Sequence, residues 1–172
     1  KLVLRTTASF GFLGSYNPEY GQSPFERFYM GGDGLSGFQF DGREIIRLRG
    51  YKNFSLVPAL NGFGDDGTFG TLLEGGSVFN KFNLELRYPL SLNPQATVYL
   101  LAFLEGGNNF IDFTDYNPFD LYRSAGGGVR LFLPMFGLIG FDYVFGLDGP
   151  SLGSNAVRQP GGQFHITIGQ QF

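Results

Sequence analysis

The chain of 172 residues contains no cysteine, no tryptophan and a single histidine. Without cysteine it can form neither a disulfide scaffold nor a thiolate metal site. The one histidine, His165, cannot build a metal site by itself. We therefore expect neither a bound metal nor a cofactor.

Long apolar runs are also missing, because no stretch approaches the ~18 consecutive apolar residues of a membrane helix. A net charge of −3 and a pI of about 5.0 argue against a nucleic-acid partner, which requires a basic surface. The chain is instead rich in aromatic residues and glycine, with 21 Phe, 9 Tyr and 28 Gly, and only 16% of its residues are charged. This composition suits tightly connected strands with one apolar face, and the length fits one domain.

Six segments alternate between apolar and polar residues with a period of two, which predicts β-strands. The predicted strands cover residues 1–13, 76–90, 96–111, 122–133, 138–147 and 163–172. Seven charged residues of these strands share one face: Arg5, Lys81, Glu85, Arg87, Glu105, Arg130 and Asp142. His165 lies on the same polar face, where we expect it to be solvated. Asn80 and Arg123 fall on the apolar side, and Arg123, at a strand end, could reach lipid headgroups.

The lengths of the connectors favour a membrane barrel over a soluble sandwich. Residues 91–95 and 134–137 form short connectors, whereas residues 14–74, 112–121 and 148–161 form long ones, in strict alternation. Outer-membrane barrels alternate short periplasmic turns with long outer loops in this way. The predicted fold class is all-β, a transmembrane antiparallel β-barrel, with each segment about as long as the ~9–11 residues of a tilted membrane strand.

Six strands are too few to close a barrel, since single-chain barrels begin at about eight strands. An open sheet edge would leave backbone groups unpaired in lipid. We therefore expect a larger barrel or closure by several copies. The absence of an initiating Met and of a signal peptide suggests a mature C-terminal piece of a longer protein.

A connector as long as 14–74 is usually either functional or disordered. Its aromatic content disfavours disorder. We expect it to fold back into the barrel, with Arg49 as its anchor. Two motifs in this loop are followed by a third on a predicted strand. They are Phe25-Glu26-Arg27-Phe28-Tyr29-Met30-Gly31-Gly32, then Arg49-Gly50-Tyr51, and finally Phe103-Leu104-Glu105-Gly106-Gly107.

These motifs resemble those of the Omp85 superfamily, and the likeness extends over the whole chain. The resemblance implies a barrel of about sixteen strands, of which this chain would supply roughly the last six. It also implies that Arg49 enters the lumen and meets Glu105 and Phe103. Independently, the alternation places both strand residues on the polar face. A guanidinium can bind a carboxylate through two hydrogen bonds and lie over an aromatic ring.

The last predicted strand resembles the superfamily's C-terminal signal, with Phe164, Ile166, Ile168 and Phe172 facing outward. Gly169 matches the position at which that strand can bend inward, and Gln170 departs from the usual apolar residue. The resemblance implies a lateral seam at this strand and a non-enzymatic role in the outer membrane of a Gram-negative bacterium. The implied partners are unfolded outer-membrane β-barrel clients, outer-membrane lipids, periplasmic or lipoprotein accessory subunits and the missing N-terminal part of the same barrel.

Other functions remain open at this point. A superfamily member that secretes or translocates a partner would carry the same motifs, and a passive porin would share the strand pattern. An esterase is the most distant alternative. Gly149-Pro150-Ser151-Leu152-Gly153 fits the GxSxG pattern, but the catalytic order requires an acid and then a histidine after the serine. No Asp or Glu follows Ser151.

Overall fold

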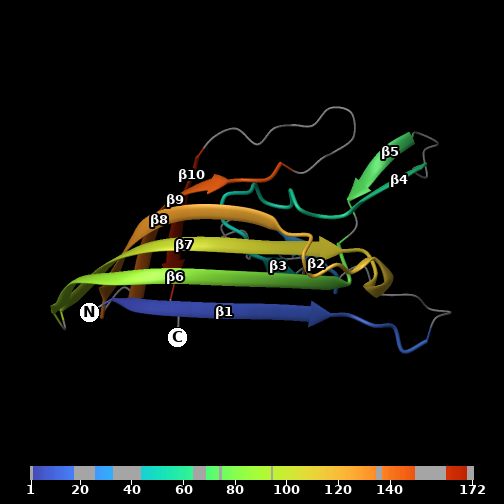
Figure 1. Cartoon of the computed structure of the whole chain (residues 1–172). Helices are drawn as coiled ribbons and strands as arrows, with labels where there is room; N and C mark the ends of the chain where they lie inside the picture. Colours follow the sequence, from blue (N-terminus) through green and yellow to red (C-terminus); the bar gives the residue numbers. More distant parts are fainter. Residues whose placement is uncertain are drawn as a thin grey trace.

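The structure is a computed structural model that describes residues 2–17, 26–32, 44–63, 69–73, 75–93, 95–134, 137–149 and 162–169. Six long strands form one antiparallel sheet in the order β1-β6-β7-β8-β9-β10 (Figure 1). Their bounds are Val3–Phe12 (β1), Val78–Asn93 (β6), Ala96–Phe110 (β7), Tyr122–Leu133 (β8), Gly137–Gly146 (β9) and Gln163–Gly169 (β10). In the described part of the chain, no helix is long and apolar enough to cross a membrane.

Each long strand lies beside its neighbour in sequence, except that β1 pairs with β6 across the long connector. The register is regular apart from a shift in β6 between Pro89 and Ser91. Proline has no N–H group for the ladder, so a bulge is an expected accommodation at this position. The turn after β6 is closed by Asn93, whose Oδ1 accepts a hydrogen bond from the N–H of Gln95 at 3.1 Å.

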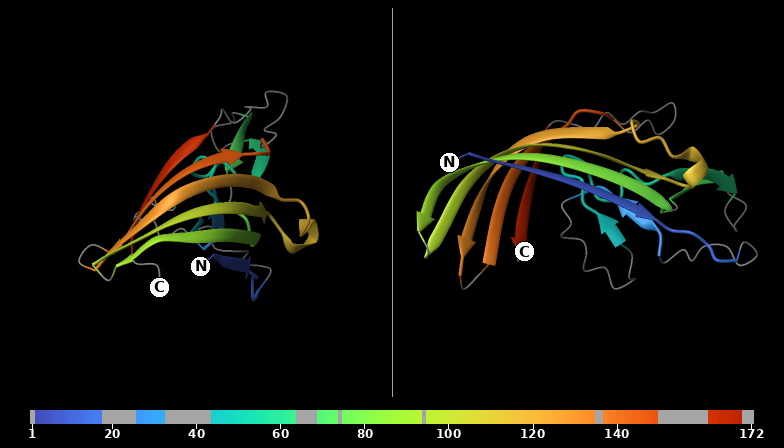
Figure 2. Two further views of the ribbon diagram at one scale, coloured as in Figure 1. Left: turned by 60° about the vertical axis from the view of Figure 1, so that its left-hand side comes forward. Right: turned by 60° about the horizontal axis from the view of Figure 1, so that its bottom comes forward.

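The sheet is strongly curved (Figure 2), and its two faces differ chemically. The convex face presents large apolar side chains to the surroundings. They include Leu4, Phe10, Phe82, Leu84, Leu86, Leu104, Phe141, Phe145, Phe164, Ile166 and Ile168, all exposed. The concave face buries charged residues, including Glu85, Glu105, Arg130 and Asp142. The alternation in the sequence therefore separates the two faces as predicted for these residues.

Part of the long connector folds against the concave face. Two short parallel strands, β2 (Phe28–Met30) and β3 (Glu44–Ile46), pair with each other. The hairpin of β4 (Ala59–Phe63) and β5 (Phe69–Leu73) follows and extends away from the sheet (Figure 1). The described side chains of the connector build a core with the wall that consists of Phe28, Met30, Leu48, Tyr51, Leu56 and Phe79.

Two polar residues on the apolar side of their strands have protein partners. Asn80 is buried, and its Nδ2 donates to the carbonyl of Pro118 at 3.2 Å. Arg123 does not depend on headgroups for a partner, because its Nε and Nη2 donate to the carboxylate of Asp148 at 2.9 and 2.8 Å. The chain itself supplies a counter-charge to Arg123, whose side chain remains 66% exposed, so its reach to headgroups stays a prediction.

Strands β1 and β10 are the two edges of the sheet, and within the described residues they do not pair with each other. The observed strands correspond in place and order to the six predicted segments. β10 is described only as far as Gly169, and Phe172 lies outside the described residues.

Candidate functional site

Arg49 lies in a turn just after β3, on the concave side of the sheet. The preceding residue, Leu48, pairs with Gly32 in an isolated bridge and is fully buried. This bridge and the core around Leu48 fix where the next side chain emerges. Arg49 itself is only 1% exposed, so its charge requires partners in the protein.

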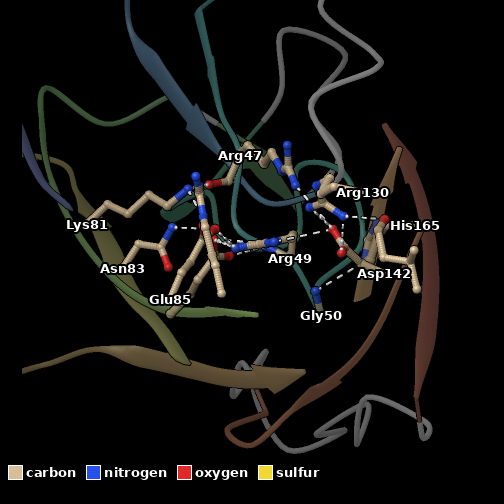
Figure 3. Close-up of polar contacts among 12 residues, drawn as sticks. Arg47, Arg49, Gly50, Lys81, Asn83, Glu85, Arg130, Asp142 and His165 are labelled. Carbon is tan, nitrogen blue, oxygen red and sulfur yellow. Dashed lines mark hydrogen bonds and ion pairs between the residues drawn. The ribbon is translucent and has the colours of Figure 1, made fainter. Parts of the chain in front are cut away.

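Those partners come from β6, β7 and β9, and Figure 3 shows Glu85 and Asp142 on opposite sides of Arg49. The backbone N–H of Arg49 donates to Glu105 Oε2 at 3.0 Å, and its Nε and Nη2 donate to Glu105 Oε1 at 2.9 and 2.6 Å. Nη2 also reaches Glu85 Oε1 at 3.1 Å, and Nη1 reaches Asp142 Oδ2 at 3.2 Å. The guanidinium carbon lies 3.4 Å from the centroid of the Phe103 ring. We call these five residues the Arg49 cluster.

The three carboxylates of the Arg49 cluster do not depend on Arg49 equally. Arg87 binds Glu85 through two hydrogen bonds of 3.0 and 2.6 Å. Arg130 binds Asp142 in the same way at 2.6 and 2.7 Å. Glu105 has Lys81 as its other cation, at 3.8 Å. Arg49 is therefore the principal counter-charge of Glu105 and an additional one for the other two acids.

The charges around the loop shift its two arginines in opposite directions. Burial lowers the pKa of Arg49, but the charges of Glu105, Asp142 and Glu85 outweigh burial and raise that pKa overall. Burial also lowers the pKa of Arg47, and the neighbouring positive charge of Arg49 lowers it further. Arg49 is thus held as a cation, whereas Arg47 sits in an environment with too few negative charges.

Cross-strand register explains how residues far apart in sequence meet. Glu85 lies opposite Phe103, and Phe103 lies opposite Gly126. A β-carbon on Gly126 would lie 2.8 Å from Phe103 Cζ. A β-carbon on Gly128 would overlap the carboxylate of Asp142. These glycines of β8 leave the room that the aromatic ring and the carboxylate occupy.

Gly50 brings the backbone of the loop against β8 and β9. Its φ of +87° lies in the left-handed region, which glycine adopts without strain. A β-carbon here would lie 3.0 Å from Ser124 Cβ and 3.1 Å from Gly146 N. Both the backbone conformation and the close approach therefore favour glycine after Arg49.

Two further contacts hold the loop on the other side of Arg49. The N–H of Gly50 donates to His165 Nε2 on β10 at 3.1 Å, and the hydroxyl of Tyr51 donates to the carbonyl of Arg123 on β8 at 2.6 Å. Burial raises the pKa of Tyr51 to about 12, so the phenol stays protonated at neutral pH. His165 is only 6% exposed, which corrects the expectation that it would be solvated.

The structure therefore brings together all five predicted residues of the loop anchor: Arg49, Gly50, Tyr51, Phe103 and Glu105. It adds Glu85, Asp142 and His165, which the alternation placed on the polar face without linking them to Arg49. The missing information was the register between strands and the depth of the loop. Within the described residues, no group of three or more His, Cys, Asp and Glu side chains is arranged to hold a metal ion.

The predicted residues of the last strand lie apart from this cluster. Phe164, Ile166 and Ile168 point to the convex face and are exposed by 62%, 39% and 64%. A β-carbon on Gly169 would have no neighbour within 4 Å. The described structure thus places an exposed apolar row along β10, an edge strand whose inner face contacts the loop through His165.

The site is thus an Arg-anchored loop on the charged concave face of a curved antiparallel sheet whose convex face is apolar. The chain matches the Omp85 superfamily domain over residues 1–172. It therefore belongs to the Omp85 superfamily, whose members insert or translocate proteins at outer or related membranes. No curated protein sequence gives a significant match.

Proposed function

We propose that the chain is the C-terminal wall of a BamA-like assembly protein of about sixteen strands. This protein folds and inserts other β-barrel proteins into the outer membrane of a Gram-negative, Bacteroidetes-like bacterium. The role is non-enzymatic and uses no cofactor. Its partners are unfolded barrel clients, outer-membrane lipids, periplasmic or lipoprotein accessory subunits and the remaining strands of the same barrel.

The observation that carries this proposal is the link between the buried loop and the edge strand β10. The Arg49 cluster fixes the loop against β6, β7 and β9. The next residue, Gly50, then contacts β10 through His165. The loop is thus placed to support the inner face of an edge strand whose outer face is apolar.

An edge strand exposes a row of unpaired N–H and C=O groups, to which another strand can add. In lipid such groups are several kcal/mol less stable than paired ones. An incoming client strand that pairs with β10 would satisfy them and enter the bilayer already hydrogen-bonded. No covalent bond changes in this step, and the apolar residues Phe164, Ile166 and Ile168 would face lipid beside the client.

Folding of a client by the complete protein in lipid vesicles tests the proposal. A urea-unfolded outer-membrane barrel is added, and its folding is followed by heat-modifiable gel mobility and protease protection. Photo-crosslinking residues are placed at Phe164 or Ile166 on β10. The matched control is Val129, which faces outward on the interior strand β8.

We expect faster client folding than in empty vesicles and crosslinks from β10 but not from Val129. Client captured inside the vesicles without insertion would favour the alternative, a secretion or translocation pore. Steady large conductance in planar bilayers, with no effect on client folding, would instead identify a passive porin-like barrel. Equal crosslinking from β8 and β10 would contradict a seam at the last strand.

A further inference from the structure

A polar cavity of about 270 Å³ lies on the concave face between the loop and the first two strands of the sheet. Its lining includes Arg5, Thr7 and Ser9 of β1, Lys81 of β6 and Arg47 of the loop. The Arg49 cluster forms one side of the cavity, but these five residues lie outside that cluster. They have no part in the function proposed above.

The charges around this cavity do not balance. Its lining holds six basic side chains, namely Arg5, Arg47, Arg49, Lys81, Arg87 and Arg130, and two acidic ones, Glu85 and Glu105. Asp142, which pairs with Arg130, raises the acids to three. Six cations against three carboxylates leave three positive charges without a counter-charge among the described residues.

The surplus charge can be assigned to particular side chains. Arg49, Arg87 and Arg130 each form an ion pair of 2.6 Å with a carboxylate. Arg47 reaches Asp142 only at 3.5 Å, and its Nε is buried without a hydrogen-bond partner. Lys81 donates to the carbonyl of Arg47 and lies 3.8 Å from Glu105. Among the described residues, Arg5 forms no ion pair.

The electrostatics of Arg47 point in the same direction. Its pKa is lowered by burial and by the neighbouring charge of Arg49, and the nearby acids only partly compensate. The Arg47 side chain is 19% exposed, and its buried, unpaired Nε–H group is unfavourable because it lacks an acceptor. The position therefore has a positive potential that favours an anion, and the exposed part of the Arg47 side chain can contact it.

We propose that this cavity binds a phosphate group. Phosphate carries about −1.5 to −2 charges at neutral pH and presents several strong acceptor oxygens, so it offsets the surplus better than one carboxylate. Arg47 and Lys81 approach from one side, while Arg5 and the hydroxyls of Thr7 and Ser9 lie at alternate positions of β1, on one face of that strand. The group can come from inorganic phosphate or from a phosphomonoester on a lipid headgroup.

Calorimetric titration of the complete protein in detergent tests this site. Inorganic phosphate is compared with acetate at matched pH and ionic strength, and short-chain phosphatidic acid represents the lipid source. We expect saturable phosphate binding that weakens about tenfold or more in Arg47→Gln, as expected for loss of a charge-assisted hydrogen bond. Lys52→Gln is the matched control, because Lys52 is an exposed cation of the same loop.

A Thr7→Val/Ser9→Ala double variant provides a second test that leaves the loop arginines intact, and we expect weaker phosphate binding there too. Binding of phosphatidic acid in competition with phosphate would assign the site to a lipid headgroup. Binding of inorganic phosphate alone would assign it to the free ion. Absence of saturable binding, equal binding of acetate, or binding unchanged in Arg47→Gln would overturn the proposal. No client enters the assay, so its failure would leave the assembly function untouched.

Discussion

Replacing Arg49 by alanine removes the cation of the Arg49 cluster. The structure shows which of the three carboxylates then loses its principal counter-charge. Glu85 keeps Arg87, and Asp142 keeps Arg130, both as two-point ion pairs. Glu105, only 4% exposed, keeps Lys81 at 3.8 Å. Removing one member of a buried ion pair destabilises a protein by about 3–5 kcal/mol, mainly because the partner charge is left buried. We expect a loss of this size in Arg49→Ala.

The same reasoning predicts how a second substitution behaves. Glu105→Gln in the Arg49→Ala background removes the stranded charge, so we expect it to restore about 1–3 kcal/mol. Glu85→Gln in that background should restore little, because Glu85 is already paired with Arg87. Lys52→Ala, at an exposed position of the loop, is the control for removal of a positive charge.

Urea titration of the barrel in lipid vesicles gives the free energies of unfolding for this double-mutant cycle. The temperature at which gel mobility changes provides an independent ranking. Protease cleavage within residues 44–57 reports whether the loop has left the wall. Equal rescue by Glu105→Gln and Glu85→Gln, or no rescue by either, would refute the assignment of Arg49 as the counter-charge of Glu105.

Three further outcomes follow from the contacts beside Arg49. Gly50→Ala should destabilise the loop by about 1–3 kcal/mol, because position 50 has a positive φ and lies close to β8. The control Gly149→Ala should not destabilise it, since a β-carbon at position 149 has no neighbour within 4 Å. Limited proteolysis of the loop compares the two variants. Tyr51, whose pKa is raised to about 12 from 10.0, contributes stability that is complete below pH 10 and is lost as pH rises toward 12. Tyr51→Phe should therefore flatten the decline of unfolding free energy over that window, and an unchanged slope would argue against the buried phenol. His165→Phe removes the acceptor for the N–H of Gly50 and should increase hydrogen exchange at Gly50, whereas exchange equal to wild type would show that this bond does not hold the loop.

The alternation of the sequence was sufficient to predict the strands and their faces, because side-chain direction in a strand has a fixed period. It placed Phe103 and Glu105 on the inner face before any pairing was known. Register was not predictable in the same way, since it depends on the bulge after Pro89 and on turns that carry no periodic signal. The roles of Glu85 and Asp142 in binding Arg49 therefore emerge only from the paired sheet.

The loop shows a different limit of sequence analysis. Its length and its Arg49-Gly50-Tyr51 motif predicted an infolded segment. Nothing in the alternation specified how deeply the segment enters or that it reaches β10. The contact with His165 depends on a left-handed glycine and on the small residues of the wall around it. A lone histidine on a polar face gives no signal of such a partner.

Capture of the loop on the wall tests the central claim most directly, and residues 1–172 contain no native cysteine that would compete. The structure places a β-carbon at position 50 at 3.0 Å from Ser124 Cβ, within reach of a disulfide after a small shift. Gly50→Cys/Ser124→Cys should form an intramolecular disulfide in membranes, once each single variant is shown to keep its heat-modifiable fold. Gly50→Cys/Val129→Cys, with the second cysteine on the outward face of the same strand, should not. Failure of the first pair to link, or equal linking of both pairs, would contradict a loop held inside the sheet by Arg49.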